Sequence, residues 1–207
     1  KGQRKTMKQP RIKLAAIDLD GTLLNDEKRL CDGAAEILEA AAAKGVQIVP
    51  VTGRPLAGIP LCVRRLSFIN FYISSNGAQI IDASTQKSLY SFAVANEKSR
   101  AAVRLLRQHG CTFEPFANGW GYTEQAIYDD YLRRFGGTPL EEYVTSSRKI
   151  ISSVESVFED GVTQADEFFV QCSDGERRAA LCRDLETLGG LQYWTLGDRF
   201  MEITRAD

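Results

Sequence analysis

The chain of 207 residues contains a single histidine, His109, and no long apolar run. One histidine gives little support to Ser-His-Asp chemistry or to a metal site built from histidines. No stretch of the sequence approaches the roughly 20 apolar residues that a membrane helix needs. We therefore expect neither a membrane partner nor histidine-based catalysis.

Cysteines are few, odd in number and widely spaced. The five lie at Cys31, Cys62, Cys111, Cys172 and Cys182, and no two of them have CxxC spacing. This pattern suggests neither a disulfide framework nor a zinc site. It predicts a reducing, cytoplasmic location.

An excess of charge of either sign is also lacking. The chain has 26 Lys and Arg residues against 27 Asp and Glu, which gives a formal net charge of −1 and argues against a dedicated nucleic-acid binder. A basic run lies within residues 1–12, which we expect to form a solvated tail. The apolar segment behind it, Leu14 to Ile17, is far too short for the core of a signal peptide.

Apolar strands and helices alternate in the first part of the chain. The apolar runs are KLAAID at 13–18, VQIVPV at 46–51 and FYISS at 71–75. Each is typical of a strand buried on both faces. Helices are expected between them, at 31–45 and from about Leu56 to Leu66. This order predicts a doubly wound α/β core with a parallel sheet over residues 13–83.

The pattern changes after residue 83. Paired strands and helices suggest an α+β module inserted at 84–203, with residues 204–207 returning towards the core. The turn dipeptide Asn118-Gly119 is expected to join two strands of this module. A change of pattern, and not a linker, marks the boundary, so the module should pack close to the core.

Polar residues follow each of the three predicted core strands. They are Asp18 and Asp20 after the first, Thr52, Gly53 and Arg54 after the second, and Ser74, Ser75, Asn76 and Gly77 after the third. An open parallel sheet binds ligands beyond the carboxyl ends of its strands. The coincidence of the three motifs is therefore more informative than any one of them.

Two carboxylates at i and i+2 can point to the same side of an extended chain. Since like charges repel, such a pair favours a cation between them, and Mg²⁺ suits hard oxygen ligands, water and substrate phosphate. One aspartate could then attack phosphorus while the other moves the proton. Gly21 permits a tight turn, the amides around Leu19 could face phosphate oxygens, and Thr52 offers a hydroxyl and a backbone amide.

Each motif also has a simpler interpretation. An aspartate after a strand is often a turn former, Thr52 could cap a strand-to-helix turn, and Asn76-Gly77 is a common turn dipeptide. On spacing alone, a nucleotide-sugar glycosyltransferase with a DxD motif stays open. His109 precedes Gly110 at the end of a predicted helix, where we expect it to favour the helix dipole and not to catalyse.

Together, the segments AAIDLDGTLLN, VPVTGRP and ISSNGAQI resemble the haloacid dehalogenase-like superfamily and, within it, the Cof-type phosphatases. The resemblance covers the whole chain. It implies a Rossmann-like core, an inserted cap domain and an Mg²⁺-dependent phosphatase of small phosphorylated metabolites such as sugar phosphates. Asp18 would be the nucleophile and Asp20 the general acid/base, with Mg²⁺ held by the Asp18 carboxylate and the Asp20 backbone carbonyl.

The resemblance also implies how the substrate is held. Thr52 and Gly53 would bind the transferring phosphoryl group, and Arg54 and Asn76 would line the substrate side. The cap would close over the site, exclude water and select the substrate. Candidate cap contacts are Trp120, Tyr122, Arg133 and Arg134, although packing or solvation is the simpler use of each.

One departure from the family pattern concerns the end of the chain. The family's third-motif lysine and its GDxxND-like fourth motif do not follow the cap, and the Gly-Asp at 197–198 is expected to be a turn. We therefore expect a fragment with apolar surface exposed at one sheet edge and with impaired turnover. The alternatives are a phosphomutase or phosphotransferase, and a non-catalytic phosphate-binding module. Nothing in the sequence indicates an oligomeric state.

Overall fold

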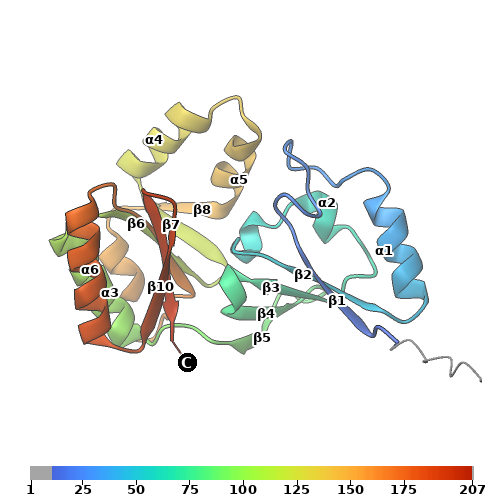
Figure 1. The fold of residues 1–207 in the computed structure, drawn as a ribbon, viewed down its shortest axis with the longest axis horizontal. Coiled ribbons are helices and arrows are strands. Elements are labelled where there is room, and N and C mark those ends of the chain that lie inside the picture. Colours follow the sequence, from blue (N-terminus) through green and yellow to red (C-terminus); the bar gives the residue numbers. More distant parts are fainter. Residues whose placement is uncertain (1–10, 207) are drawn as a thin grey trace, which may run out of the picture.

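The computed structural model describes residues 11–206, which form two β-sheets with helices around them (Figure 1). The predicted basic tail, residues 1–12, falls almost entirely outside the described residues. No helix between residues 11 and 206 combines the length and the apolar character needed to cross a membrane.

The first sheet has the strand order β1-β2-β3-β4-β5. Its strands are β1 (Leu14–Asp18), β2 (Gln47–Val51), β3 (Phe71–Ser74), β4 (Gln79–Asp82) and β5 (Ser88–Ser91). Strands β1, β2 and β3 are parallel, as predicted, and β4 and β5 are added antiparallel to them. The connections contain α1 (Ala34–Ala43), α2 (Leu61–Arg64) and the short 3-10 helices η1 (Leu56–Gly58) and η2 (Ser75–Gly77). The carboxyl ends of β1, β2 and β3 therefore meet at one edge of this sheet.

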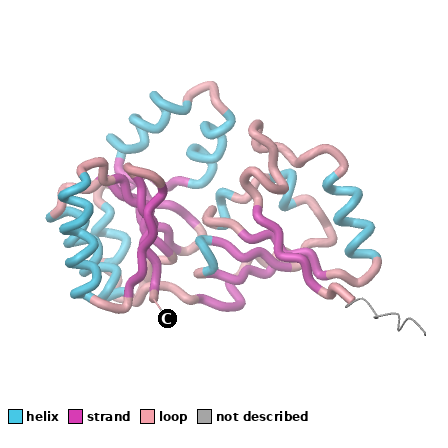
Figure 2. The backbone as a smooth tube through the Cα atoms, viewed as in Figure 1, coloured by secondary structure: helices cyan, strands magenta, loops and turns pink. Residues whose placement is uncertain are grey.

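The second sheet has the order β10-β11-β9-β6-β7-β8. Its strands are β6 (Thr112–Ala117), β7 (Trp120–Glu124), β8 (Arg148–Ile151), β9 (Glu167–Gln171), β10 (Leu191–Leu196) and β11 (Phe200–Arg205). Its helices are α3 (Asn96–Gln108), α4 (Gln125–Phe135), α5 (Pro139–Ser147), α6 (Gly175–Leu188) and the 3-10 helix η3 (Val154–Phe158). Helices α3 and α6 cover one face of the sheet, whereas α4 and α5 lie apart from them on the side towards the first sheet (Figures 1 and 2).

Side chains of β9 and β11 alternate between the two faces of the second sheet. Phe168, Val170, Met201 and Ile203 are fully buried in the core shared with α3 and α6. The residues between them, among them Phe169, Phe200 and Glu202, point to the opposite face because successive strand residues do so. One face of this sheet thus packs into the hydrophobic core, and the opposite face is not part of that core.

The predicted boundary at residues 83/84 stays a prediction, but the sheets bear on it. It falls in the turn between β4 and β5, which pair within the first sheet. Sheet membership changes only between β5 and β6, and an antiparallel bridge between Val94 and Ala165 follows the change. Sheet pairing therefore favours a boundary after Ser91.

Two details of the predicted core are wrong. The helix expected from Leu56 to Leu66 is two short helices, η1 and α2, separated by Pro60, whose ring and missing N–H stop a helix from continuing through it. Strand β1 is not buried on both faces, because it lies at the sheet edge and Leu14 is 56% exposed. Apolar surface is therefore exposed at one edge of this sheet, as expected.

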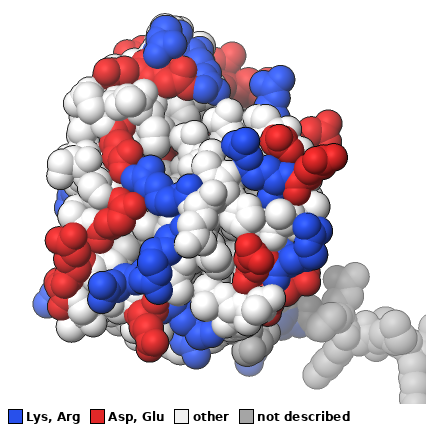
Figure 3. All heavy atoms as spheres, turned by 90° about the vertical axis from the view of Figure 1, so that its left-hand side faces the viewer, with Lys and Arg blue, Asp and Glu red and all other residues white. Residues whose placement is uncertain are grey.

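Charge is distributed evenly on the face of the molecule that Figure 3 shows. Basic and acidic side chains are interspersed there, with no extended area of one sign. This face offers no continuous basic surface of the kind that tracks a nucleic-acid backbone.

Candidate active site

A cavity of about 500 Å³ lies between the carboxyl end of the first sheet and the second sheet. From the first sheet and its loops it is lined by Asp18, Asp20, Lys28, Thr52, Gly53, Arg54 and Asn76. The parallel strands β1, β2 and β3 end side by side, which brings their polar residues to one place. Six of the nine residues singled out from the sequence line this cavity.

Asp18 is the last residue of β1 and is exposed at the cavity. Its Oδ2 accepts a hydrogen bond from the Thr22 hydroxyl at 3.3 Å. Within residues 11–206, its other oxygen accepts none. Asp18 therefore presents a carboxylate oxygen that can act as a nucleophile or bind a cation.

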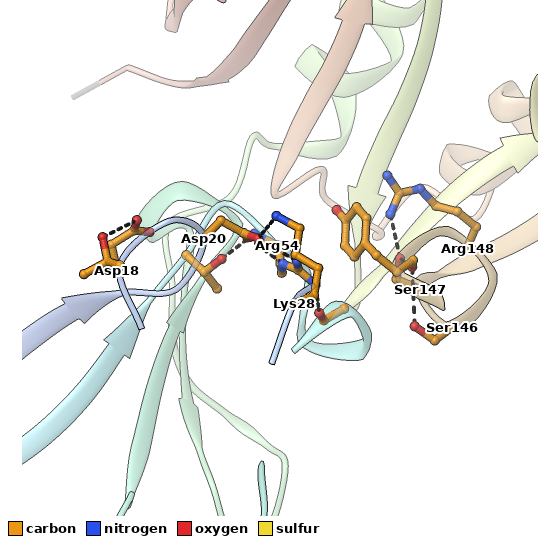
Figure 4. A network of polar contacts seen from close by, with 11 residues as sticks. Asp18, Asp20, Lys28, Arg54, Ser146, Ser147 and Arg148 are labelled. Atoms are coloured by element: carbon orange, nitrogen blue, oxygen red, sulfur yellow. Dashed lines mark hydrogen bonds and ion pairs between the residues drawn. The ribbon is translucent and has the colours of Figure 1, made fainter. Parts of the chain in front are cut away.

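Asp20 is held by two cations (Figure 4). Arg54 donates from Nε and Nη2 to the two carboxylate oxygens, both at 2.7 Å, and Lys28 Nζ donates to Oδ1 at 2.8 Å. Partial burial acts to raise the pKa of Asp20, but the hydrogen bonds and charges of Arg54 and Lys28 outweigh it and lower the pKa to about 2. Asp20 is thus firmly ionised in this arrangement.

The segment after β2 uses most of its polar groups within the protein. The Thr52 amide donates to the Ile73 carbonyl at 2.9 Å, so it is not available for phosphate as the sequence suggested. The Thr52 hydroxyl accepts from the Arg54 amide at 3.1 Å and keeps its own proton for a ligand. Arg54 also donates to the Gly58 carbonyl at 2.9 Å and lies over the Tyr143 ring of α5, 4.4 Å from its centroid.

Asn76 connects the first sheet to the second. Its backbone is left-handed, with φ 52°, and its Nδ2 donates to Glu167 Oε2 at 2.5 Å. Gly53 leaves room for this side chain, since a Cβ at Gly53 would lie 2.9 Å from Asn76 Oδ1. Asn76 therefore lines the cavity with its amide directed at the second sheet, and its place on the substrate side stays a prediction.

Three predicted site residues do not line the cavity. The Leu19 side chain is fully buried in the core of the first sheet, the Gly21 amide donates to the Leu24 carbonyl at 3.1 Å, and Gly77 forms part of η2. Gly21 and Gly77 both have positive φ, of 77° and 94°, which glycine adopts without strain. Their role in this structure is to shape the loops around the cavity.

The far wall of the cavity comes from the second sheet and from α4 and α5. It consists of Phe116, Tyr131, Arg134, Phe135, Leu140, Tyr143, Val144, Arg148, Glu167, Phe169, Phe200 and Glu202. Of the four candidate cap contacts, only Arg134 is among them, whereas Trp120 and Tyr122 lie against Lys149 and Arg133 is exposed. The other eleven could not be predicted from the sequence, because they come from helices α4 and α5 and from strands that lie far apart in the chain.

A buried ion pair joins Arg148 of this wall to Glu114 of β6. Arg148 Nε donates to Glu114 Oε2 at 3.2 Å, and the two side chains are 4% and 0% exposed. The Arg148 guanidinium lies over the rings of Phe116 and Tyr143, at 4.7 and 4.9 Å from their centroids. A Cβ at Gly121 would lie 2.6 Å from Arg148 Cδ, so the glycine on the neighbouring strand makes room for the arginine.

The candidate metal donors are the Asp18 carboxylate and the Asp20 backbone carbonyl. Within the described part of the chain, no three His, Cys, Asp or Glu residues are grouped to hold a metal ion. Mg²⁺ commonly takes one or two protein carboxylates and completes its shell with water and substrate phosphate. The open carboxylate of Asp18, beside the polar floor of the cavity, fits such a cation.

Comparison with known proteins identifies the family. The family model of haloacid dehalogenase-like hydrolases matches residues 15–207, and the chain belongs to this family. It is 41% identical to YxeH of Bacillus subtilis over 151 residues, which cover 72% of this chain and 54% of that protein. It is 43% identical to the 5-amino-6-(5-phospho-D-ribitylamino)uracil phosphatase YcsE of Bacillus subtilis over 72 residues, or 35% of this chain and 29% of that protein. The chain thus spans about half or less of the length of these curated relatives.

Solved structures share the fold. A haloacid dehalogenase-like hydrolase from B. subtilis superposes with a TM-score of 0.77 at 23% identity, covering 94% of this chain and 73% of that one. A subclass IIB sugar phosphatase of the same superfamily gives a TM-score of 0.70 at 21% identity, covering 93% and 70%. The family that the three motifs predicted and the α/β fold class that the alternation of strands and helices predicted are therefore confirmed.

Proposed function

We propose that the protein to which this chain belongs is an Mg²⁺-dependent phosphatase of small phosphorylated metabolites. The observation that carries the proposal is the floor of the cavity, where an open carboxylate on Asp18 lies with the Thr52 hydroxyl and the Arg54–Lys28 pair of cations. A cytoplasmic location belongs to the same proposal and is supported by the unpaired cysteines.

In this proposal Asp18 attacks the phosphorus and the bond to the leaving oxygen breaks. Asp20 gives that oxygen a proton, and it later takes a proton from the water that hydrolyses the phosphoryl group on Asp18. In this structure Arg54 and Lys28 hold Asp20 ionised, so the proton that Asp20 gives to the leaving oxygen must first come from solvent water or from the substrate phosphate, when these cations turn from Asp20 to the phosphoryl oxygens. A magnesium ion held by Asp18 and the Asp20 carbonyl would neutralise charge on the phosphate.

Phosphate release from p-nitrophenyl phosphate tests the proposal. We expect Mg²⁺-dependent release that EDTA abolishes and that Asp18→Asn lowers about 1,000-fold or more, because the nucleophile is lost. Asp26→Asn is the matched control, since Asp26 is exposed and lies outside the cavity. Equal release by the Asp18 variant and the control would contradict the proposal.

A further inference from the structure

The face of the second sheet that lines the cavity alternates acidic and aromatic residues. Directly paired residues on neighbouring strands point to the same face. Glu114 pairs with Phe169, Phe169 with Glu202, and Glu202 with Trp194. One row across four strands therefore reads acid, aromatic, acid, aromatic.

Two rings of this face form an apolar surface inside the cavity. Phe169 and Phe200 are stacked, with centroids 5.3 Å apart and planes at 18°. Both line the cavity. Such a surface suits the carbon skeleton of a leaving group and not a bare ion.

The charged residues on this wall differ in the partners that they have. The cations are matched by carboxylates, Arg148 by Glu114 and Arg134 by Asp130. The cavity-lining acids have neutral partners, since Glu202 Oε2 accepts from Trp194 Nε1 at 2.6 Å and Glu167 Oε2 accepts from Asn76. Among residues 11–206, the Glu202 carboxylate thus has no paired cation at this end of the cavity.

Glu167 in particular has an oxygen left for a ligand. The residue is 1% exposed and lines the cavity, and only its Oε2 accepts a hydrogen bond from any residue between 11 and 206. Burial and the charge of nearby Glu202 raise the pKa of Glu167 well above its usual range, against smaller opposite effects of the Asn76 hydrogen bond and of Arg148. Burial also raises the pKa of Glu202. Both carboxyls therefore lack sufficient stabilisation, which a donor on a ligand would supply.

The opposite end of the cavity contains Arg54 and Lys28, which pair with Asp20 in this structure and can turn to the phosphoryl oxygens of a bound ester. A dianionic phosphate fits there, and a second anion would face the Glu202 carboxylate at the wall.

We propose that the substrate is a phosphate monoester whose leaving group carries amino or hydroxyl donors and no second negative charge, and that Glu202 selects it. The inference rests on the proposed function, since it takes the floor of the cavity as the place of the phosphate. Glu202 acts on specificity by contact with the leaving group, whereas Phe169 and Phe200 support its apolar part.

Three pyranose esters of similar shape test this charge selection: the 1-phosphates of glucosamine, glucose and glucuronate, which place a cation, a neutral group and an anion in the leaving group. Binding to the Asp18→Asn protein is measured by calorimetry, so that no turnover is needed. We expect the glucosamine ester to bind at least about tenfold more tightly than the glucuronate ester, because like charges are opposed only in the latter. In Glu202→Gln this ratio should fall to within about threefold, while the amide oxygen can still accept from Trp194.

Glu176→Gln is the matched control, because Glu176 is an exposed residue of α6 outside the cavity, and it should leave the ratio unchanged. Equal binding of the three esters, or a ratio that Glu202→Gln does not alter, would overturn the inference. Failure of the proposed function itself shows separately, as phosphate release from p-nitrophenyl phosphate that Asp18→Asn does not lower.

Discussion

At the scale of single residues, Asp20 shows how a site can depend on its counter-ions. Its pKa of about 2 lies below the ordinary value of 3.8, although burial alone would raise it, because Arg54 and Lys28 stabilise the carboxylate. A lowered acid pKa contributes stability that is present above about pH 4 and is lost as the pH falls towards 2. The side chain is 37% exposed, so solvent reduces this contribution.

Replacing Arg54 should remove most of the effect that lowers the pKa of Asp20. In Arg54→Met we expect the pKa of Asp20 to rise towards 3.8, because two of its three charged hydrogen bonds are lost. Carbon-13 NMR titration of the labelled carboxyl group measures the change. Lys28→Met removes one bond and should give a smaller rise. A pKa that stays near 2 without Arg54 would show that the ion pair is not its cause.

The pKa of Asp166 is raised and not lowered, so its contribution to stability changes with pH in the opposite direction. Burial raises its pKa to about 6, and the hydrogen bond from Gln79 Nε2, at 2.6 Å, offsets only part of this. Because the folded chain holds this proton more tightly than the unfolded chain, stability falls as the pH rises from about 4 to 6. We expect Asp166→Asn to be more stable than the unchanged protein at pH 7, by up to about 3 kcal/mol, and to lose this advantage below pH 4. Urea unfolding at the two pH values measures it, and an advantage independent of pH would contradict the assignment.

At the scale of elements, η1 packs closely on α5 because residue 58 is a glycine, which has no side chain. A Cβ at Gly58 would lie 2.6 Å from Tyr143 Cε2, and the Gly58 carbonyl accepts from Arg54. We expect Gly58→Ala to lower the free energy of unfolding by about 1–3 kcal/mol and to weaken phosphate binding, because Tyr143 and Arg54 must shift. Thermal unfolding and calorimetry measure the two effects. Gly175→Ala is the control, because nothing lies within 4 Å of its Cβ position.

The elements also show what could be predicted from the sequence. Apolar runs and the residues that follow them predicted the three parallel strands and the meeting of Asp18, Thr52 and Asn76, because local pattern and the geometry of parallel sheets determine both. The cavity wall could not be predicted in this way. The pairing of Phe169 with Glu202 and with Glu114 joins strands far apart in the chain, and no local pattern specifies that register.

At the scale of the whole molecule, apolar side chains are exposed along one edge of the first sheet. Strand β1 is the end strand of this sheet, and Leu14 and Ile37 are 56% and 69% exposed. Helix α1 has no buried residue. An unpaired strand edge with apolar neighbours favours association between chains.

We therefore expect this chain to self-associate as its concentration rises. The double variant Leu14→Lys and Ile37→Lys should stay monomeric over a wider range, because charge at an edge strand opposes pairing. Sedimentation velocity over a concentration series measures this. Val162→Lys, at a position 75% exposed in the loop between η3 and β9, should behave as the unchanged protein does. Equal association of all three proteins would exclude the edge as its cause.

Because side chains alternate along β9 and β11, the same strands contribute residues both to the hydrophobic core and to the cavity wall. Phe168, Val170 and Met201 hold the second sheet to its helices, whereas their neighbours Phe169 and Phe200 face the cavity. Exchange of a cavity-facing residue leaves the adjacent core residue in its place. Descendants of one ancestral chain can therefore acquire different substrates through few mutations, without first losing the ability to fold.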